Sequence, residues 1–105
     1  MQTSSNQRLF GMLGFAMRAG KMIVGTDLVC RAMPSGRVKL VLISQGASDS
    51  TKKKLTTKCE FYGIRSVVAD IDTEELARII GKSFAVAAVA ITEVAFAKEI
   101  TKLFE

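Results

Sequence analysis

The residues best placed to recognise a ligand form one short junction, Gly25-Thr26-Asp27, between an apolar run and a predicted helix. The start of a helix leaves backbone N–H groups without intrahelical partners, and here a hydroxyl and a carboxylate accompany them. Such an end can cradle a phosphate or exchange hydrogen bonds with base edges, with Lys21 and Arg31 close by in the sequence. Thr and Asp are also ordinary helix N-caps, so a structural role explains the junction alone at least as well.

The charge of the chain favours an anionic partner. Its 105 residues hold 15 Lys and Arg against 10 Asp and Glu, a formal net charge of +5. In a small domain this favours nucleic acid, although a basic surface that only maintains solubility is the alternative. The run Lys52-Lys53-Lys54 spreads over about 200° of a helix, so a solvated face explains it better than the alternative, a phosphate-contacting patch. The expected basic footprint flanks the junction in the sequence: Arg18, Lys21, Arg31 and Arg37.

The residue types argue against catalysis. The chain has no histidine, which excludes Ser-His-Asp and Cys-His catalysis and most zinc sites. Neither common glycine-rich nucleotide loop is present. The acidic residues between Asp70 and Glu75 fit a capped helix start better than an acid pair. Cys30 and Cys59 form no C-x-x-C pair. We expect a non-enzymatic protein with reduced thiols, no metal and no cofactor.

The elements that must position the junction follow a repeated order of helix, glycine and apolar strand. Glycines that close predicted helices are Gly20, Gly36, Gly63 and Gly81. The predicted strands that follow them span residues 21–24, 38–43, 64–69 and 84–92. Two of these are apolar at successive positions, which is typical of strands covered by helices on both faces. The pattern predicts an α/β fold: a three-layer αβα sandwich with a small central sheet of about four strands, 38–43 in the middle, in one domain spanning 1–105.

Capping residues predict where the helices begin. The second helix should run from Thr26 or Asp27 to Gly36, and the last one over residues 94–104. The longest apolar run is too short to cross a membrane, which takes about 20 residues. Without a signal peptide, the chain is expected in the cytoplasm, with no membrane partner. The other predicted helix starts are Ser4, Ser48 or Asp49, and Asp72.

Two segments resemble the L7Ae/L30e family of RNA-binding proteins. Residues 18–44 follow the family order of AGK, a short strand, G-T-N-E, a helix and a KLV-type strand. Residues 81–91, GKSFAVAAVAI, are similar to the family's hydrophobic loop and last strand, G-x-x-V-A-A-A-S-V-A-I. The second match is the more specific because it falls at the expected distance from the first. The resemblance extends over nearly the whole chain.

The resemblance implies RNA binding. In the family, the G-T-N-E helix end reads tandem sheared G·A pairs of a kink-turn, while the loop packs against an extruded base. Polar edge readers beside an apolar platform are a common arrangement in RNA recognition. The expected partner is a kink-turn-like internal loop in ribosomal or regulatory RNA, bound by a monomer, with the ribosome as one setting. Together with the flanking basic residues, the predicted RNA contacts are Lys21, Gly25, Thr26, Asp27, Arg31, Arg37, Lys82, Ser83, Phe84, Ala85 and Val86.

The sequence departs from the family pattern at the helix start that matches G-T-N-E. Asp27 stands where Asn is usual, and an ionised carboxylate accepts hydrogen bonds but donates none. Leu28 replaces the usual Glu, and Thr73 occupies a place where some members have lysine. The chain therefore looks like a bacterial L7Ae-like branch in which kink-turn recognition is weakened or retargeted. The alternative is a protein-interaction module on the same fold, with the apolar loop and Leu28 as its patch.

Overall fold

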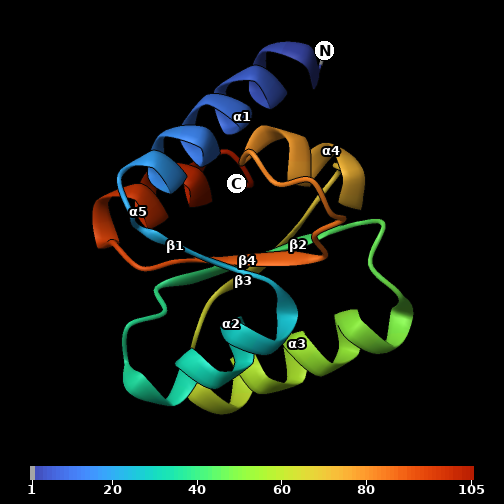
Figure 1. Ribbon diagram of the computed structural model, residues 1–105. Helices are drawn as coiled ribbons and strands as arrows, with labels where there is room; N and C mark the ends of the chain where they lie inside the picture. Colours follow the sequence, from blue (N-terminus) through green and yellow to red (C-terminus); the bar gives the residue numbers. More distant parts are fainter. Residues whose placement is uncertain (1) are drawn as a thin grey trace.

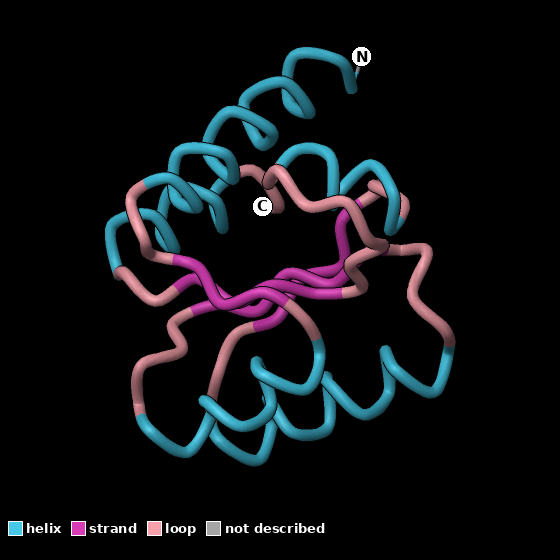
Figure 2. Tube along the Cα trace, in the orientation of Figure 1, coloured by secondary structure: helices cyan, strands magenta, loops and turns pink. Residues whose placement is uncertain are grey.

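A computed structural model describes residues 2–105, and the side chains of residues 6–105. One sheet lies between two helical layers, with α1, α4 and α5 on one face and α2 and α3 on the other (Figures 1 and 2). This confirms the predicted αβα sandwich with a four-stranded sheet. The elements are α1 (Gln2–Arg18), β1 (Met22–Val24), α2 (Thr26–Ala32), a 3-10 helix (Met33–Ser35), β2 (Leu40–Ser44), α3 (Asp49–Tyr62), β3 (Ser66–Ala69), α4 (Thr73–Ile79), β4 (Ala88–Ile91) and α5 (Val94–Lys102).

The last strand of the chain, β4, lies inside the sheet, between β1 and β2. The strand order is β1-β4-β2-β3, with β4 antiparallel to both of its neighbours and β2 parallel to β3. Strand β2 therefore lies in the interior of the sheet, as predicted for 38–43, and all five of its residues are buried. Leu40 and Leu42 enter the core beneath α1, α4 and α5, while Val41 and Ile43 enter the core beneath α2 and α3. Two cores explain why this strand is apolar at successive positions.

The strand directions give the sheet two distinct ends. At the end that we call the carboxyl end, β1, β2 and β3 finish and β4 begins; the Gly25 N–H donates to the Ala88 carbonyl there, at 2.9 Å. At the opposite end, which we call the amino end, the Lys39 N–H donates to the Ile91 carbonyl at 2.8 Å. Residues that follow β1 and residues that precede it thus lie at opposite ends of the sheet.

Predicted caps and boundaries agree with the structure at most helices. The Ser48 hydroxyl accepts from the Thr51 N–H, and the Asp72 carboxylate accepts from the Glu75 N–H, at 3.1 and 2.7 Å. The prediction for Ser4 is wrong, because α1 begins at Gln2 and includes it. The predicted second helix is divided in two: α2 ends at Ala32, and a 3-10 turn follows it. Pro34, at the start of that turn, has no N–H with which to continue an α-helix.

All four predicted strands are shorter in the structure. The largest differences are residues 38–39, 64–65 and 84–87, which lie outside β2, β3 and β4. Strand β1 ends opposite Val89, and the last ladder bond to β2 runs from the Ser44 N–H to the Ala87 carbonyl, at 2.8 Å, so residues 84–86 lie beyond the end of both neighbouring strands. No helix within residues 2–105 is long and apolar enough to cross a membrane.

Cys59 is 1% exposed in the core beneath α2 and α3, and its thiol should make the free energy of unfolding fall at alkaline pH. Burial, with a smaller contribution from Cys30, raises the pKa of Cys59 from 9.0 to about 11. Between these values the unfolded chain loses a proton that the folded chain keeps. We expect this group to lower the free energy of unfolding by about 1.4 kcal/mol per pH unit between pH 9 and 11, and not below pH 9. Urea unfolding at several pH values should show a steeper decline in the parent than in Cys59→Ala; equal slopes would contradict the prediction.

Candidate nucleic-acid interface

Gly25 shapes the start of α2. It is the N-cap residue, with φ 100° and ψ 145°, a backbone conformation that only glycine adopts readily. Its carbonyl accepts from the Val29 N–H at 3.0 Å, which closes the first turn. Within the part of the chain that the structure describes, the N–H groups of residues 26–28 donate to no other residue. The junction therefore presents unpaired donors at the carboxyl end of the sheet, as the sequence predicts.

Asp27 and Leu28 are exposed beside these donors. Asp27 is the second residue of α2 and not its cap, and Leu28 is 55% exposed. The only ion pair in residues 6–105 joins Lys102 to Glu99, so the Asp27 carboxylate has no cationic partner. A free carboxylate can accept hydrogen bonds from a ligand.

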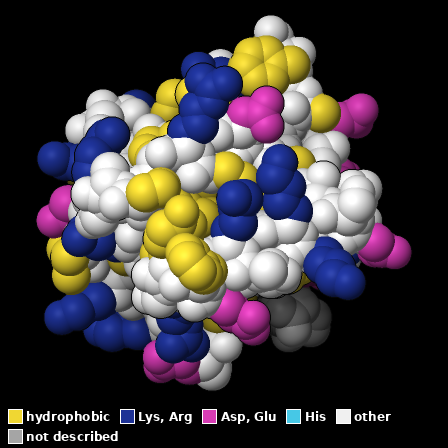
Figure 3. All heavy atoms as spheres, turned by 90° about the horizontal axis from the view of Figure 1, so that it is seen from below, with side chains coloured by type: hydrophobic (Ala, Val, Ile, Leu, Met, Phe, Trp, Pro, Cys, Tyr) yellow, Lys and Arg dark blue, Asp and Glu magenta, His cyan; other side chains and the backbone are white. Residues whose placement is uncertain are grey.

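A groove between α2 and α3 continues this surface. It is lined by Asp27, Cys30 and Arg31 of α2 and by Lys54 and Lys58 of α3. Three cations therefore converge beside the junction. Figure 3 shows that Lys and Arg side chains are spread over this side of the molecule, next to a hydrophobic patch near its middle. Such a surface fits a phosphate backbone.

Sequence reasoning missed two of these cations. It treated the lysine run as a solvated face and did not consider Lys58. The spacing of Lys54 and Lys58, four residues apart on one helix, places them on one face and was the available signal. Lys53, the residue before Lys54, is exposed but does not line the groove.

The loop before β4 contributes the apolar part of the site. Phe84 is 60% exposed, and Ser83 and Ala85 are also exposed. Lys82 is half-buried and, with Ser83, Phe84 and Ala85, borders a hollow beside α4. Val86 is 2% exposed, so the structure places it in the core and not on the contact surface that the sequence predicted.

Hydrogen bonds anchor this loop to the carboxyl end. The Val86 N–H donates to the Thr73 carbonyl at 3.0 Å, at the start of α4. The buried Ser44 hydroxyl donates to the Ile71 carbonyl at 2.6 Å and accepts from the Gly46 N–H at 3.0 Å. These bonds hold the segments after β2 and before α4 together, so the loop has a fixed base beneath its exposed residues.

One hydrogen bond brings the two predicted motifs together. The Gly25 N–H donates to the Ala88 carbonyl, which joins the junction directly to the residue where the loop enters β4. The donors of residues 26–28, the Asp27 carboxylate and the exposed loop residues therefore occupy the same end of the sheet. The arrangement combines polar readers with an apolar platform, the combination used for unstacked bases.

Most of the predicted basic footprint lies elsewhere. Arg18, Lys21 and Arg37 all lie at the amino end, and only Arg31 lies beside the groove. Strand β1 separates Lys21 from Gly25 by about 13 Å, and α2 runs back along the sheet before Arg37. The expectation that all four residues flank the junction is therefore wrong, because neighbours in sequence are separated here by one strand or one helix.

The fold and this surface define a class of small αβα sandwich proteins with a glycine-started helix beside an apolar loop. The chain belongs to the ribosomal protein L7Ae/L30e/S12e/Gadd45 family, whose sequence pattern matches residues 7–101. It is similar to "RNA-binding protein YlxQ" of Bacillus subtilis, with 38% identity over 96% of this chain and 99% of the relative. "RNA-binding protein YlxQ" of Enterococcus faecium is 31% identical over 100% of this chain and 99% of the relative.

A solved structure agrees with this family assignment. A protein of unknown function from Bacillus halodurans superimposes with a TM-score of 0.84 and 33% identity. The match covers 90% of this chain and 94% of that protein. The resemblance predicted from residues 18–44 and 81–91 is therefore confirmed at the level of the family.

Proposed function

We propose that this protein binds structured RNA at the carboxyl end of its sheet. The target is a kink-turn-like internal loop in ribosomal or regulatory RNA. One observation carries the proposal: the Gly25–Ala88 hydrogen bond places an unpaired set of donors and the Asp27 carboxylate next to an exposed apolar loop. Two relatives that match nearly the whole chain are named RNA-binding proteins, which supports RNA as the ligand.

Each part of the surface has a distinct role in this proposal. The N–H groups of residues 26–28 donate to the RNA, and Asp27 accepts from the N1–H and N2–H₂ groups of guanine. Arg31, Lys54 and Lys58 neutralise phosphates along the groove between α2 and α3. Phe84, at the tip of the loop, covers an unstacked base.

The protein is not an enzyme, as the residue types predict. Membership of the L7Ae family and the similarity to YlxQ confirm this. The residues of the interface supply hydrogen bonds, charge and apolar surface, and binding is the function that these groups support.

Salt dependence tests the electrostatic part of the proposal. With three to five phosphate contacts, the logarithm of the affinity for a kink-turn RNA should fall with log salt at a slope of about −2 to −5. Replacing both Lys54 and Lys58 by alanine should make the slope shallower by about 2, whereas Lys53→Ala should leave it unchanged. Fluorescence anisotropy of a labelled kink-turn RNA measures this, and the same RNA with Watson–Crick pairs in place of its G·A pairs is the control. Binding that is indifferent to salt would contradict the proposal.

Two exposed apolar side chains support a second candidate function. Leu28 and Phe84 are 55% and 60% exposed near the same end of the sheet, and apolar surface of this kind also marks protein interfaces. In that case the carboxyl end would dock a protein partner. A salt-insensitive complex with a protein, and no RNA in the purified material, would favour it.

A further inference from the structure

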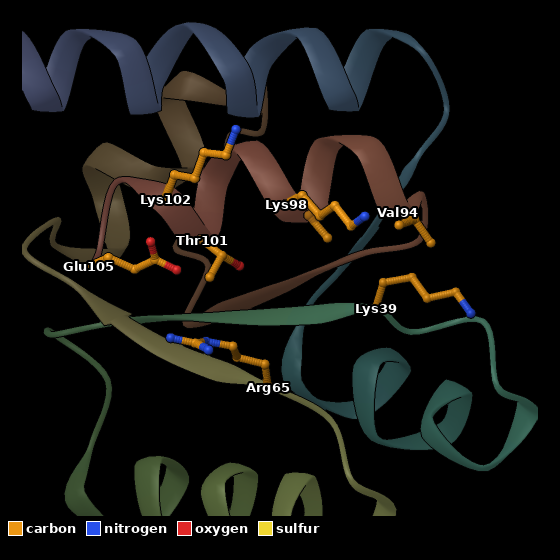
Figure 4. Close-up of a pocket in the computed structure, with 8 residues that line it drawn as sticks. Lys39, Arg65, Val94, Lys98, Thr101, Lys102 and Glu105 are labelled. Carbon is orange, nitrogen blue, oxygen red and sulfur yellow. The ribbon is translucent and has the colours of Figure 1, made fainter.

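A second basic groove lies at the amino end of the sheet, away from the proposed kink-turn site. It runs between α5 and the starts of β2 and β3 and encloses about 460 Å³. Figure 4 shows Lys39 and Lys98 at the end of the groove near Val94, with Arg65 and Glu105 at the other end. None of these residues belongs to the surface formed by Gly25, α2 and the loop before β4.

Three of the four cations that line this groove have no ion-pair partner among residues 6–105. The single ion pair in residues 6–105 is Lys102–Glu99, so Lys39, Arg65 and Lys98 have no carboxylate within ion-pairing distance. The Lys39 ammonium donates only to the Gly36 carbonyl, at 2.9 Å. Lys102, the fourth cation of the lining, pairs with Glu99, so three unpaired cations remain against the one carboxylate of Glu105. This excess of positive charge favours an anionic occupant.

Part of the lining of the groove is apolar. Val94 and Ala97 of α5 line it, and Val94 remains 49% exposed. An occupant that fits must therefore carry apolar surface as well as spaced negative charges. A single strand of RNA has both, because its phosphates are separated by sugars and by unpaired bases that pack on apolar side chains.

We propose that the amino-end groove binds single-stranded RNA. This inference rests on the proposal that RNA is the ligand of the protein, but not on the kink-turn interface. Lys21 and Arg37, which the sequence analysis assigned to the RNA footprint, lie at this same end of the sheet but do not line the groove. An RNA that fills both sites contacts opposite ends of the sheet, which β2 separates by about 17 Å.

The test uses a labelled oligouridylate of about 12 nucleotides, which cannot form a kink-turn. Lys98→Glu and Arg65→Glu should each weaken its binding about tenfold and make the salt slope shallower by about 0.7 for each phosphate that the variant no longer neutralises. Lys53→Glu carries the same charge change as Lys98→Glu outside the groove and should stay within about twofold of the parent. Val94→Asp, which places a carboxylate in the apolar part of the lining, should also weaken binding. Circular dichroism checks the folding of each variant.

The outcomes separate this inference from the proposed function. Groove variants that lose affinity for oligouridylate but keep their affinity for a kink-turn RNA support two separate sites. If the parent binds no kink-turn RNA while the groove variants still lose oligouridylate, the proposed function fails and this inference stands. If Arg31→Ala loses affinity for oligouridylate while Lys98→Glu keeps it, the inference of a second site is overturned. Tighter binding of an acidic peptide, oligoglutamate of equal length, than of oligouridylate would also overturn it and assign the groove to a protein partner.

Discussion

Replacing Asp27 by alanine is expected to weaken binding to a kink-turn RNA by about 1–3 kcal/mol, or about 5- to 150-fold. The carboxylate is exposed, has no cationic partner in the described chain and lies beside the unpaired donors of residues 26–28. Its loss removes the proposed acceptor for a guanine edge. Isothermal titration with parent and variant measures the change.

The same substitution should leave the fold intact. Gly25, not Asp27, is the N-cap of α2, so the variant loses only the interaction of an acidic side chain with the helix start, about 0.3–1 kcal/mol. Asp27→Asn is the matched variant: it keeps one acceptor, adds a donor and removes repulsion from phosphate, so it should bind at least as well as the parent. If Asp27→Ala binds like the parent while Arg31→Ala abolishes binding, the surface is a phosphate clamp and does not read guanine.

Gly25→Ala is expected to lower the free energy of unfolding by about 1–3 kcal/mol. A Cβ at this position meets no atom within 4 Å, so the cost comes from the backbone alone, held at φ 100°. Relaxing that strain shifts the N–H groups of residues 26–28 and should weaken RNA binding as well. Urea unfolding and RNA titration of the same variant measure the two effects.

Gly11 supplies the matched control. It lies inside α1, and a Cβ there also meets nothing within 4 Å, but its backbone is helical. Gly11→Ala should therefore stabilise the protein by up to about 1 kcal/mol, because alanine is the better helix former. An equal response of both glycines to alanine would show that the junction relaxes at no cost, contrary to the prediction.

Much of the fold could be predicted from local patterns. Glycines at helix ends and apolar runs after them predict the layers, and the continuous apolar character of β2 predicts its interior position. The strand order could not be predicted in this way, because nothing local in β4 indicates that it pairs with β1 and β2. Lys21 and Arg37 lie away from Gly25 for a different reason, because β1 spans the sheet between Lys21 and Gly25 and α2 runs back along it before Arg37.

The candidate site was predicted only in part, because local patterns do not show which distant segments come together. The junction and the exposed residues 83–85 were identified separately, and the Gly25–Ala88 bond joins them. Val86 was misassigned because the apolar loop runs directly into an apolar strand, so residue type alone does not mark where burial begins. Lys54 and Lys58 were missed because the sequence does not show that α3 packs beside α2 with Arg31 facing the same groove.

The position of β4 also determines when the protein can work during its own synthesis. Pairing of β1 with β4 joins residues 22–24 to residues 89–91, a closure that spans most of the chain. A ribosome-bound chain that stops before Ala88 has no carbonyl for the Gly25 N–H and no strand between β1 and β2. Helices α1 to α4 can form, but the sheet stays open and the two halves of the proposed RNA interface stay apart. The proposed interface is therefore assembled only after β4 has been synthesised, although most of its residues come much earlier in the chain.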